Sequence, residues 1–217
     1  MRKQAKIGIR TMKSENELRG KGENVQRRTP NAEGRMPDAI SHLYVHIPFC
    51  ARICPYCAFY KERADSSQTQ RFCEALLREI DSAAEEFPLK LETIFFGGGT
   101  PTALTTAQLE FLLSGMRDQL DLSRLVEWTV EANPGSVSPR KATLLREMGV
   151  SRISLGVQSW DDELLKLLGR EHNAAQAEAS FQILRDAGFG NVSITVTAVS
   201  SVGLSAAVNA KAKTGPT

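Results

Sequence analysis

Between residues 43 and 199, short apolar stretches alternate with longer stretches of helical periodicity. Strand-like residues occupy 43–49, 91–96, 127–131, 152–157 and 191–199. Helical patterns occupy 70–86, 109–120, 139–148 and 174–187. Five strands separated by four helices predict repeated βαβ units, and therefore a parallel sheet of the α/β class. Right-handed crossovers bring the carboxyl ends of the strands to one edge, where ligands bind in barrels and in open sheets.

The chain has the size and composition of an ordinary globular protein of one domain or slightly more. It holds 217 residues, of which 41% are hydrophobic and 24% charged. No apolar run approaches the ~18 residues that would cross a membrane. No apolar stretch near the N-terminus resembles a secretory signal. We therefore expect a cytoplasmic protein without a membrane span.

Charge divides the chain into a basic leader and a mildly acidic body. Residues 1–40 hold ten Lys or Arg and five Asp or Glu, whereas 41–217 hold seventeen and twenty. The body lacks a basic excess that would bind phosphate backbones, so we expect no nucleic-acid partner. The leader has no aromatic and few large apolar residues, which predicts disorder. Its acid-free first fourteen residues resemble a transit peptide, but the acid-containing stretch behind them favours a plain tail or a start placed too far upstream.

Three of the four cysteines, Cys50, Cys54 and Cys57, share the segment CARICPYC with C-x₃-C-x₂-C spacing. The segment follows the first strand, so the thiolates can converge at the sheet edge. Soft thiolates at this spacing favour an iron–sulfur cluster or zinc. Three thiolates on a four-iron cluster leave one iron open to a substrate, whereas structural zinc needs a fourth ligand, such as His42 or His46. A disulfide is disfavoured because the chain has no export signal.

The fourth cysteine and the last histidine are expected to be structural. Cys73 lies in a predicted helix, where a buried free cysteine packs as a small hydrophobe. His172 is assigned no chemistry. Asp161, Asp162 and Glu163 are expected to cap and begin a short helix after the fourth strand, because the helix dipole favours acids there.

Polar and glycine-rich residues follow the ends of three further strands. The run Gly97-Gly98-Gly99-Thr100 lets the backbone approach a ligand closely, and its N–H and C=O groups could hold a carboxylate and an ammonium. Alone, a plain glycine turn is the commoner interpretation of such a run. Glu131 and Gln158 end two strands, and Arg170 presents a planar cationic fork that suits a carboxylate. Alone, each of these three is more often a solvated surface residue.

Four segments carry a resemblance to a known family. They are LYVHIPFCARICPYCAF (43–59), FFGGGTPTAL (95–104), EANPG (131–135) and GVSRISLGVQSWDDELLKLLGREH (149–172). Together they resemble the radical SAM family, in its branch of oxygen-independent coproporphyrinogen III dehydrogenases and related heme chaperones. The resemblance runs from about Leu43 to Ile194, and it implies a partial (β/α) barrel of the radical SAM type.

The resemblance implies that Cys50, Cys54 and Cys57 bind a [4Fe–4S] cluster whose open iron takes the amino and carboxylate groups of S-adenosylmethionine. An electron from the cluster would cleave a sulfur–carbon bond of that cofactor, giving methionine and a 5′-deoxyadenosyl radical, while the protein supplies orientation. Carried over onto this chain, the residues that contact S-adenosylmethionine are Tyr44, Tyr56, Gly98, Gly99, Thr100, Glu131, Gln158 and Arg170. Without the resemblance, both tyrosines would be assigned to core packing.

Phe59 favours the heme chaperones within this branch, because the dehydrogenase pattern has a further cysteine at that position. The resemblance then implies a protein that binds heme and delivers it to acceptor proteins, with an electron donor as a second partner. Two alternatives stay open. The chain could be an oxygen-independent coproporphyrinogen III oxidase of porphyrin biosynthesis, or a heme- or cluster-binding module without turnover. A structural protein that binds zinc is the remaining hypothesis.

The C-terminal residues depart from the family pattern. The fifth strand of the family carries an aspartate for S-adenosylmethionine, and Thr195 stands at that position here. The stretch 195–217 matches nothing in the pattern and contains no acidic residue. We therefore expect a leader over 1–40, a radical SAM core over 41–194, and an aberrant tail over 195–217. A truncated or frameshifted product, incomplete at its C-terminus, would look like this and could be inactive.

Overall fold

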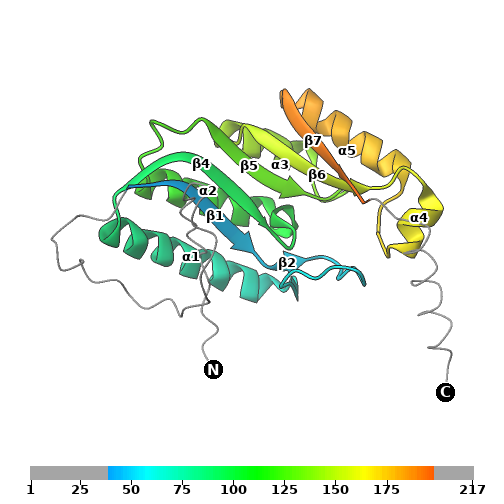
Figure 1. Cartoon of the computed structure of the whole chain (residues 1–217), viewed down its shortest axis with the longest axis horizontal. Helices are drawn as coiled ribbons and strands as arrows, with labels where there is room; N and C mark the ends of the chain where they lie inside the picture. Colours follow the sequence, from blue (N-terminus) through cyan, green and yellow to red (C-terminus); the bar gives the residue numbers. More distant parts are fainter. Residues whose placement is uncertain (1–38, 198–217) are drawn as a thin grey trace, which may run out of the picture.

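The structure of the chain is a computed structural model that describes residues 39–197 (Figure 1). The predicted leader, apart from its last two residues, lies outside the described residues. So does the predicted tail, apart from residues 195–197. Both segments therefore stay predictions. In the part that the structure describes, no helix is long and apolar enough to cross a membrane.

Five parallel strands form the main sheet. They are β1 (Ile40–Ile47), β4 (Leu89–Gly98), β5 (Glu127–Ala132), β6 (Arg152–Gln158) and β7 (Asn191–Val196). Their order in the sheet is β1-β4-β5-β6-β7, so each strand lies beside its predecessor in the sequence (Figure 1). This sequential order is that of a (β/α) barrel wall, which confirms the predicted fold class. Among the described residues, β1 and β7 form the two edges of the arc.

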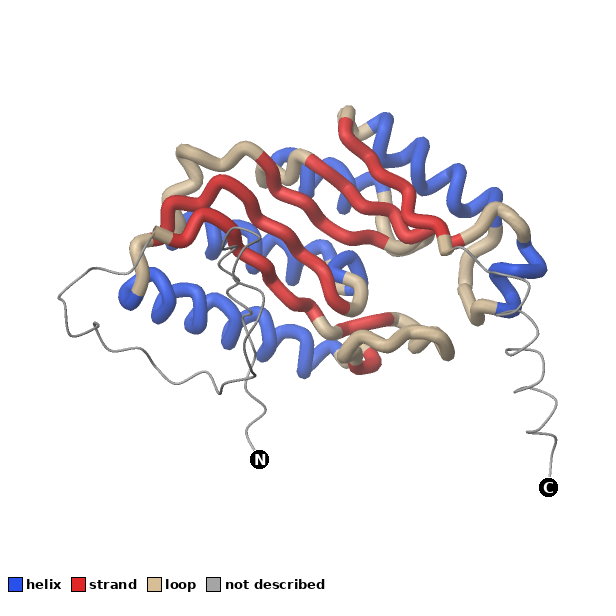
Figure 2. Tube along the Cα trace, in the orientation of Figure 1, coloured by secondary structure: helices blue, strands red, loops and turns tan. Residues whose placement is uncertain are grey.

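The helices lie between successive strands in the sequence, and the four longest, α1, α2, α3 and α5, cover one face of the sheet (Figure 2). They are α1 (Ser66–Glu86), the short 3₁₀ helix η2 (Pro101–Ala103), α2 (Thr106–Gln119), α3 (Pro139–Glu147), α4 (Asp162–Leu167) and α5 (Ala174–Asp186). Right-handed crossovers between neighbouring parallel strands place every connection on the same side. The sheet therefore has one face covered by helices and one face turned toward the barrel interior.

Strand residues alternate between the two faces of the sheet. Trp128 and Val130 of β5, and Ile153 and Leu155 of β6, are fully buried against the helices. The Trp128 ring meets the Phe96 ring edge to face, with 5.7 Å between the centroids. This geometry stabilises an aromatic pair beyond the area that it buries. The apolar face accounts for the strand patterns that predicted the sheet.

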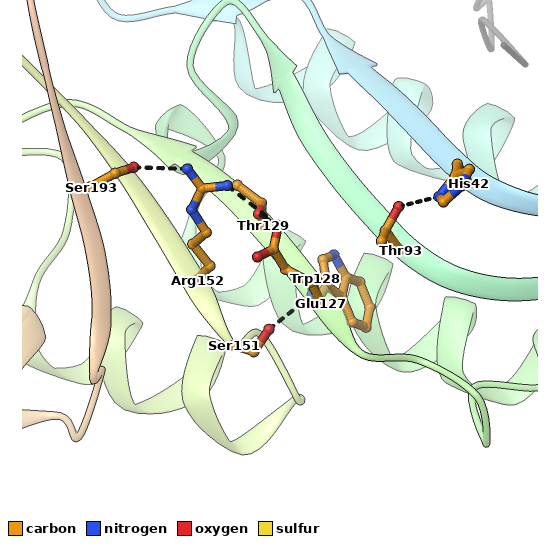
Figure 3. Close-up of polar contacts among 8 residues, drawn as sticks. All are labelled: His42, Thr93, Glu127, Trp128, Thr129, Ser151, Arg152 and Ser193. Atoms are coloured by element: carbon orange, nitrogen blue, oxygen red, sulfur yellow. Dashed lines mark hydrogen bonds and ion pairs between the residues drawn. The ribbon is translucent and has the colours of Figure 1, made fainter. Parts of the chain in front are cut away.

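The other face carries polar side chains that bond to one another across neighbouring strands (Figure 3). His42 Nδ1 lies 2.8 Å from Thr93 Oγ1. Arg152 donates to Glu127 Oε1 and to Ser193 Oγ, at 3.3 Å in both cases. The first contact joins β1 to β4, and the contacts of Arg152 join β6 to its two neighbours, β5 and β7. The interior face is therefore hydrophilic over its amino-terminal half.

Several element boundaries differ from the predicted ones. Helix α1 begins at Ser66, four residues earlier than expected, because the Asp65 carboxylate accepts hydrogen bonds from the backbone N–H groups of Ser67 and Gln68. Strand β1 begins at Ile40 rather than at residue 43. Strand β7 ends at Val196, short of the predicted 199.

A two-residue strand pair was not predicted. Strand β2 (Phe49–Cys50) pairs with β3 (Glu62–Arg63) in parallel and closes the cysteine segment into a loop. The predicted short helix after β6 is confirmed as α4, and Asp161 caps it by accepting from the N–H groups of Glu163 and Leu164.

Candidate functional site

The cysteine loop lies at the carboxyl edge of the sheet, between β2 and β3. Cys50 is buried within β2, whereas Cys54 and Cys57 are half-buried in the loop. A turn joins the last two, with the Cys57 N–H donating to the Cys54 carbonyl at 3.2 Å. The Lys61 ammonium donates to the Cys57 carbonyl and closes the far side of the loop. All three thiols are free, so the strand edge presents three soft ligands from one segment.

Two of the three thiols accept a hydrogen bond from another part of the chain. Thr100, directly after the glycine turn, places Oγ1 3.7 Å from Cys50 Sγ. Arg170, between α4 and α5, places Nη1 3.5 Å from Cys54 Sγ. Sulfur accepts such donors best when it carries negative charge. Cys50 Sγ therefore accepts from a neutral hydroxyl, and Cys54 Sγ accepts from a cationic guanidinium.

Asn133 joins these two donors. Its Nδ2 donates to Thr100 Oγ1 at 2.8 Å, and its Oδ1 accepts from Arg170 Nη2 at 2.8 Å. The same Nη2 also donates to the Gly156 carbonyl at 2.8 Å. Within the sequence EANPG only Glu131 was predicted to contact a ligand, so the role of Asn133 was not predicted. A polar residue at the carboxyl end of a predicted strand was the available signal.

The electrostatic setting differs between Cys50 and the fourth cysteine. Burial raises the pKa of Cys50, and Cys57 and Cys54 nearby raise it further. The Thr100 hydrogen bond and the Lys61 charge act in the opposite sense. Cys73 sits in α1 within the core, where burial raises the pKa of its thiol to about 11. Cys73 is thus an inert core residue, as its position in a helix predicted.

Close packing explains the glycine turn at the end of β4. Gly98 has φ of +111°, and a Cβ there would lie 2.6 Å from the His46 ring. A Cβ at Gly99 would lie 2.7 Å from the backbone of Pro48 and Phe49. Only glycine fits at either position. The turn therefore brings bare backbone to the sheet edge beside the cysteine loop.

The backbone N–H groups of this turn are partly used inside the protein. Gly99 donates to the Ile47 carbonyl at 2.8 Å, and Thr100 donates to the Phe49 carbonyl at 2.7 Å. These two amides are therefore already engaged within the protein, and the expectation that the turn holds a ligand stays a prediction. The Thr100 carbonyl in turn accepts from the Ala103 N–H at 2.8 Å.

Glu131 is the penultimate residue of β5 and lies beside the glycine turn. Burial raises the pKa of its carboxyl group, while the Gly98 N–H and the His46 ring act in the opposite sense. Burial and the Glu131 charge also raise the pKa of Tyr44. The Tyr44 hydroxyl lies 3.2 Å from His46 Nδ1, and His46 Nε2 lies 3.0 Å from the Tyr60 carbonyl. The structure thus gathers Tyr44 and Glu131, both assigned from sequence, around one histidine.

Gln158 ends β6 in a strained conformation. Its φ is +72°, and it is the one non-glycine residue with positive φ in the described range 39–197. The Thr197 hydroxyl donates to Gln158 Oε1 at 2.5 Å, and the Thr197 N–H donates to the Gln158 carbonyl at 2.8 Å. Backbone strain of this kind clusters at ligand sites. The assignment of Gln158 to the site stays a prediction.

The aromatic residues of the loop are exposed. Tyr56 is 43% exposed and Phe59 70% exposed. Burial of part of the Tyr56 side chain raises the pKa of its hydroxyl, and the Arg170 charge opposes that rise. Tyr56 therefore lies beside the same cation that contacts Cys54. Phe59 presents its ring to solvent next to the cysteines.

The histidines do not support a zinc site. His42 bonds to Thr93, far from the carboxyl end of β1, and both ring nitrogens of His46 are engaged. His172 is buried, with Nε2 2.9 Å from the Val157 carbonyl, and burial lowers its pKa. Over residues 39–197, no three His, Cys, Asp or Glu side chains lie close enough together to hold a single metal ion.

The chain belongs to the radical SAM superfamily, whose sequence pattern matches residues 44–203. Among curated relatives, it is similar to the heme chaperone HemW of Lactococcus lactis subsp. lactis, with 46% identity over 70% of this chain and 39% of that protein. The heme chaperone HemW of Bacillus subtilis is 42% identical, over 70% of this chain and 40% of that protein. The oxygen-independent coproporphyrinogen III oxidase of Paracoccus denitrificans is 30% identical, over 71% and 35%.

A solved structure gives the same result for the fold. The coproporphyrinogen III oxidase HemN of Escherichia coli, a radical SAM enzyme, matches with a TM-score of 0.67 and 27% identity. The match covers 81% of this chain and 42% of that one. The chain therefore spans about two fifths of the length of the curated relatives and of this structure.

Proposed function

We propose that Cys50, Cys54 and Cys57 bind a [4Fe–4S] cluster. The observation that carries the proposal is the pair of hydrogen bonds from Thr100 to Cys50 Sγ and from Arg170 to Cys54 Sγ. Cluster ligation requires thiolates, and donors placed on the sulfurs stabilise that form. Three cysteines from one loop match such a cluster with one iron left without a protein ligand.

We also propose that S-adenosylmethionine binds beside the cluster, at the carboxyl edge of the sheet. The residues proposed to contact it are Tyr44, Tyr56, Gly98, Gly99, Thr100, Glu131, Gln158 and Arg170. Backbone carbonyls of the glycine turn accept from its ammonium, and the Glu131 carboxylate accepts from hydroxyl or amino groups. The Arg170 Nε–H is buried and has no acceptor among the described residues, so this cation still has a donor to satisfy. With both groups bound, the site would supply one-electron radical chemistry.

The whole protein, on this proposal, is a heme chaperone that delivers heme to acceptor proteins and receives electrons from a donor. Two curated relatives with that name share 46% and 42% identity with this chain. The exposed Phe59 beside the cysteines agrees with that branch. Residues 41–194 are then its radical SAM core. The proposed compartment is the cytoplasm, where thiols such as those of the loop stay reduced.

A second candidate is an oxygen-independent coproporphyrinogen III oxidase. The structural match to an enzyme of that name, with a TM-score of 0.67, favours it. A heme- or cluster-binding module without turnover is the third candidate. All three share the cluster site, and they differ in what the loaded protein does with porphyrins.

Iron and sulfide analysis after anaerobic reconstitution tests the shared site. We expect about four irons and four sulfides per wild-type chain. Replacing any one of Cys50, Cys54 and Cys57 by serine should remove most of the bound iron. Cys73→Ser is the matched control, because Cys73 is buried in α1 away from the loop. Equal iron in all four variants, or zinc in place of iron, would refute the assignment.

Porphyrin assays separate the three candidates. A heme chaperone binds heme stably, seen as a Soret band, and transfers it to an acceptor apoprotein. An oxidase converts coproporphyrinogen III when S-adenosylmethionine and a reductant are present. Heme or cluster binding with neither transfer nor S-adenosylmethionine cleavage identifies the module.

A further inference from the structure

Asn133 stands at the centre of a hydrogen-bonded chain that runs from one loop cysteine to another. The chain passes from Cys50 to Thr100, then to Asn133, then to Arg170, and ends at Cys54. Of the three middle residues, Thr100 follows β4, Asn133 follows β5, and Arg170 lies in the segment before α5. Asn133 touches neither thiol, so any effect on the cysteines passes through its two neighbours.

The amide fixes the direction of both donors. A threonine hydroxyl has one hydrogen to donate. Because Asn133 Nδ2 donates to Thr100 Oγ1, that oxygen acts as an acceptor toward Asn133 and its own hydrogen is left for Cys50 Sγ. On the other side, Asn133 Oδ1 accepts from Nη2 of Arg170 and holds the guanidinium plane so that Nη1 faces Cys54 Sγ.

The surroundings hold the backbone of the turn that carries Asn133 and leave room for its amide. Its backbone N–H donates to Ser136 Oγ at 3.1 Å, and its carbonyl accepts from the same hydroxyl at 2.6 Å. The Lys141 ammonium donates to the Ser136 carbonyl at 3.0 Å and to the Thr102 carbonyl at 2.7 Å. A Cβ at Gly156 would lie 2.9 Å from Asn133 Oδ1, so glycine there leaves room for the amide.

We propose that Asn133 is a positioning residue that sets the reduction potential of the cluster by aiming Thr100 and Arg170 at the Cys50 and Cys54 sulfurs. The inference rests on the proposed cluster site. Hydrogen bonds to cluster sulfurs stabilise the reduced, more negative state and raise the potential. Loss of the amide releases both donors at once, so it should make the cluster harder to reduce.

The test is redox potentiometry of the full chain with its reconstituted cluster, followed by EPR. Asn133→Ala should shift the midpoint potential to a more negative value while retaining wild-type iron content. Ser136→Ala is the matched control, since it weakens the same turn and leaves both amide contacts in place. Asn133→Ser, which keeps a polar group but is too short to reach both partners, replaces the alanine variant if that one does not fold, and should give the same shift.

A double-mutant cycle checks that Asn133 acts through Thr100. In a Thr100→Val background, Asn133→Ala should shift the potential less than it does in the wild type. The hydrogen bond from Thr100 to Cys50 is already absent there, so only the Arg170 contact can still be lost. If the cluster-loaded Asn133 variants have the same midpoint potential as the wild type, the inference about Asn133 is wrong but the proposed cluster site stands. A wild-type chain that takes up no cluster would overturn the proposed function itself.

Discussion

Gly169 lies directly against Pro55 of the cysteine loop. A Cβ at Gly169 would come within 2.8 Å of the Pro55 Cδ, and Gly169 adopts a φ of +69°. The segment that follows α4 therefore packs on the cysteine loop with no room for a side chain. This contact and the Arg170 hydrogen bond to Cys54 Sγ both hold the segment after α4 against the cysteine loop.

Gly169→Ala should destabilise the chain more than a glycine replacement that meets no neighbour. Gly149 is the matched control, since its φ is +98° and a Cβ there would have nothing within 4 Å. We expect about 1–2 kcal/mol of lost unfolding free energy for Gly149→Ala from backbone strain alone. Gly169→Ala should lose at least about 1 kcal/mol more through the Pro55 contact. Urea unfolding of both variants measures the difference, and equal losses would contradict the packing argument.

Lys141→Met should destabilise the turn that carries Asn133. The ammonium donates to the Thr102 and Ser136 carbonyls, and burial lowers its pKa. Removing the ammonium leaves both carbonyls without that donor, which should cost about 1–3 kcal/mol of unfolding free energy. Lys166→Met is the control, because Lys166 pairs with Glu163 on the exposed surface and its loss should have no measurable effect. Similar unfolding midpoints for the two variants would argue against a structural role for Lys141.

Glu131→Gln should change how stability depends on pH. Burial raises the pKa of Glu131 above 4.5, so between 4.5 and the folded-state value the folded chain binds more protons than the unfolded chain. Stability from this group is therefore present at low pH and lost as the pH rises through that window. The variant lacks this loss, so its unfolding free energy relative to wild type should increase from pH 4.5 toward neutrality. Urea unfolding of cluster-free protein at several pH values measures the trend, and a constant difference would contradict it.

Arg170→Lys should weaken S-adenosylmethionine binding although the positive charge is kept. The guanidinium contacts Cys54 Sγ, Asn133 Oδ1 and the Gly156 carbonyl through two nitrogens, a geometry that an ammonium does not reproduce. We expect affinity for the cofactor to fall about tenfold, equivalent to about 1.4 kcal/mol. Equilibrium dialysis with cluster-loaded protein measures this. Arg185→Lys is the control, since Arg185 donates to the Phe189 and Gly190 carbonyls and lies over the Phe181 ring. Unchanged affinity in both variants would remove Arg170 from the site.

The fold was largely predictable because strands such as β1 and β6 bury alternate side chains, whereas β7 was found from its β-branched residues and buries no side chain among the described residues. Trp128 and Ile153 show why, since both are apolar residues on the helix-covered face of strands found from sequence. The β2–β3 pair was missed because two residues carry no periodicity. The first turn of α1 was missed because it is polar, although Asp65 provided a capping signal.

The site was predictable to the extent that its residues lie at the carboxyl ends of parallel strands. Cys50, Thr100 and Glu131 each follow or end a parallel strand, so topology alone brings them to one edge. Two details of the site could be found only from the three-dimensional structure. The N–H groups of Gly99 and Thr100 are used by backbone carbonyls that are distant in sequence. Asn133 stands in an Asn-Pro-Gly sequence that, taken alone, predicts only a turn.

The most direct test of the proposed cluster site is EPR of the reconstituted, reduced protein with and without S-adenosylmethionine. We expect a [4Fe–4S]⁺ signal that changes shape when the cofactor is added, because the cofactor reaches an iron that Cys50, Cys54 and Cys57 leave open. A signal that is identical with and without S-adenosylmethionine would contradict cofactor binding at this edge of the sheet. Absence of any such signal in a folded, iron-treated chain would contradict the cluster itself.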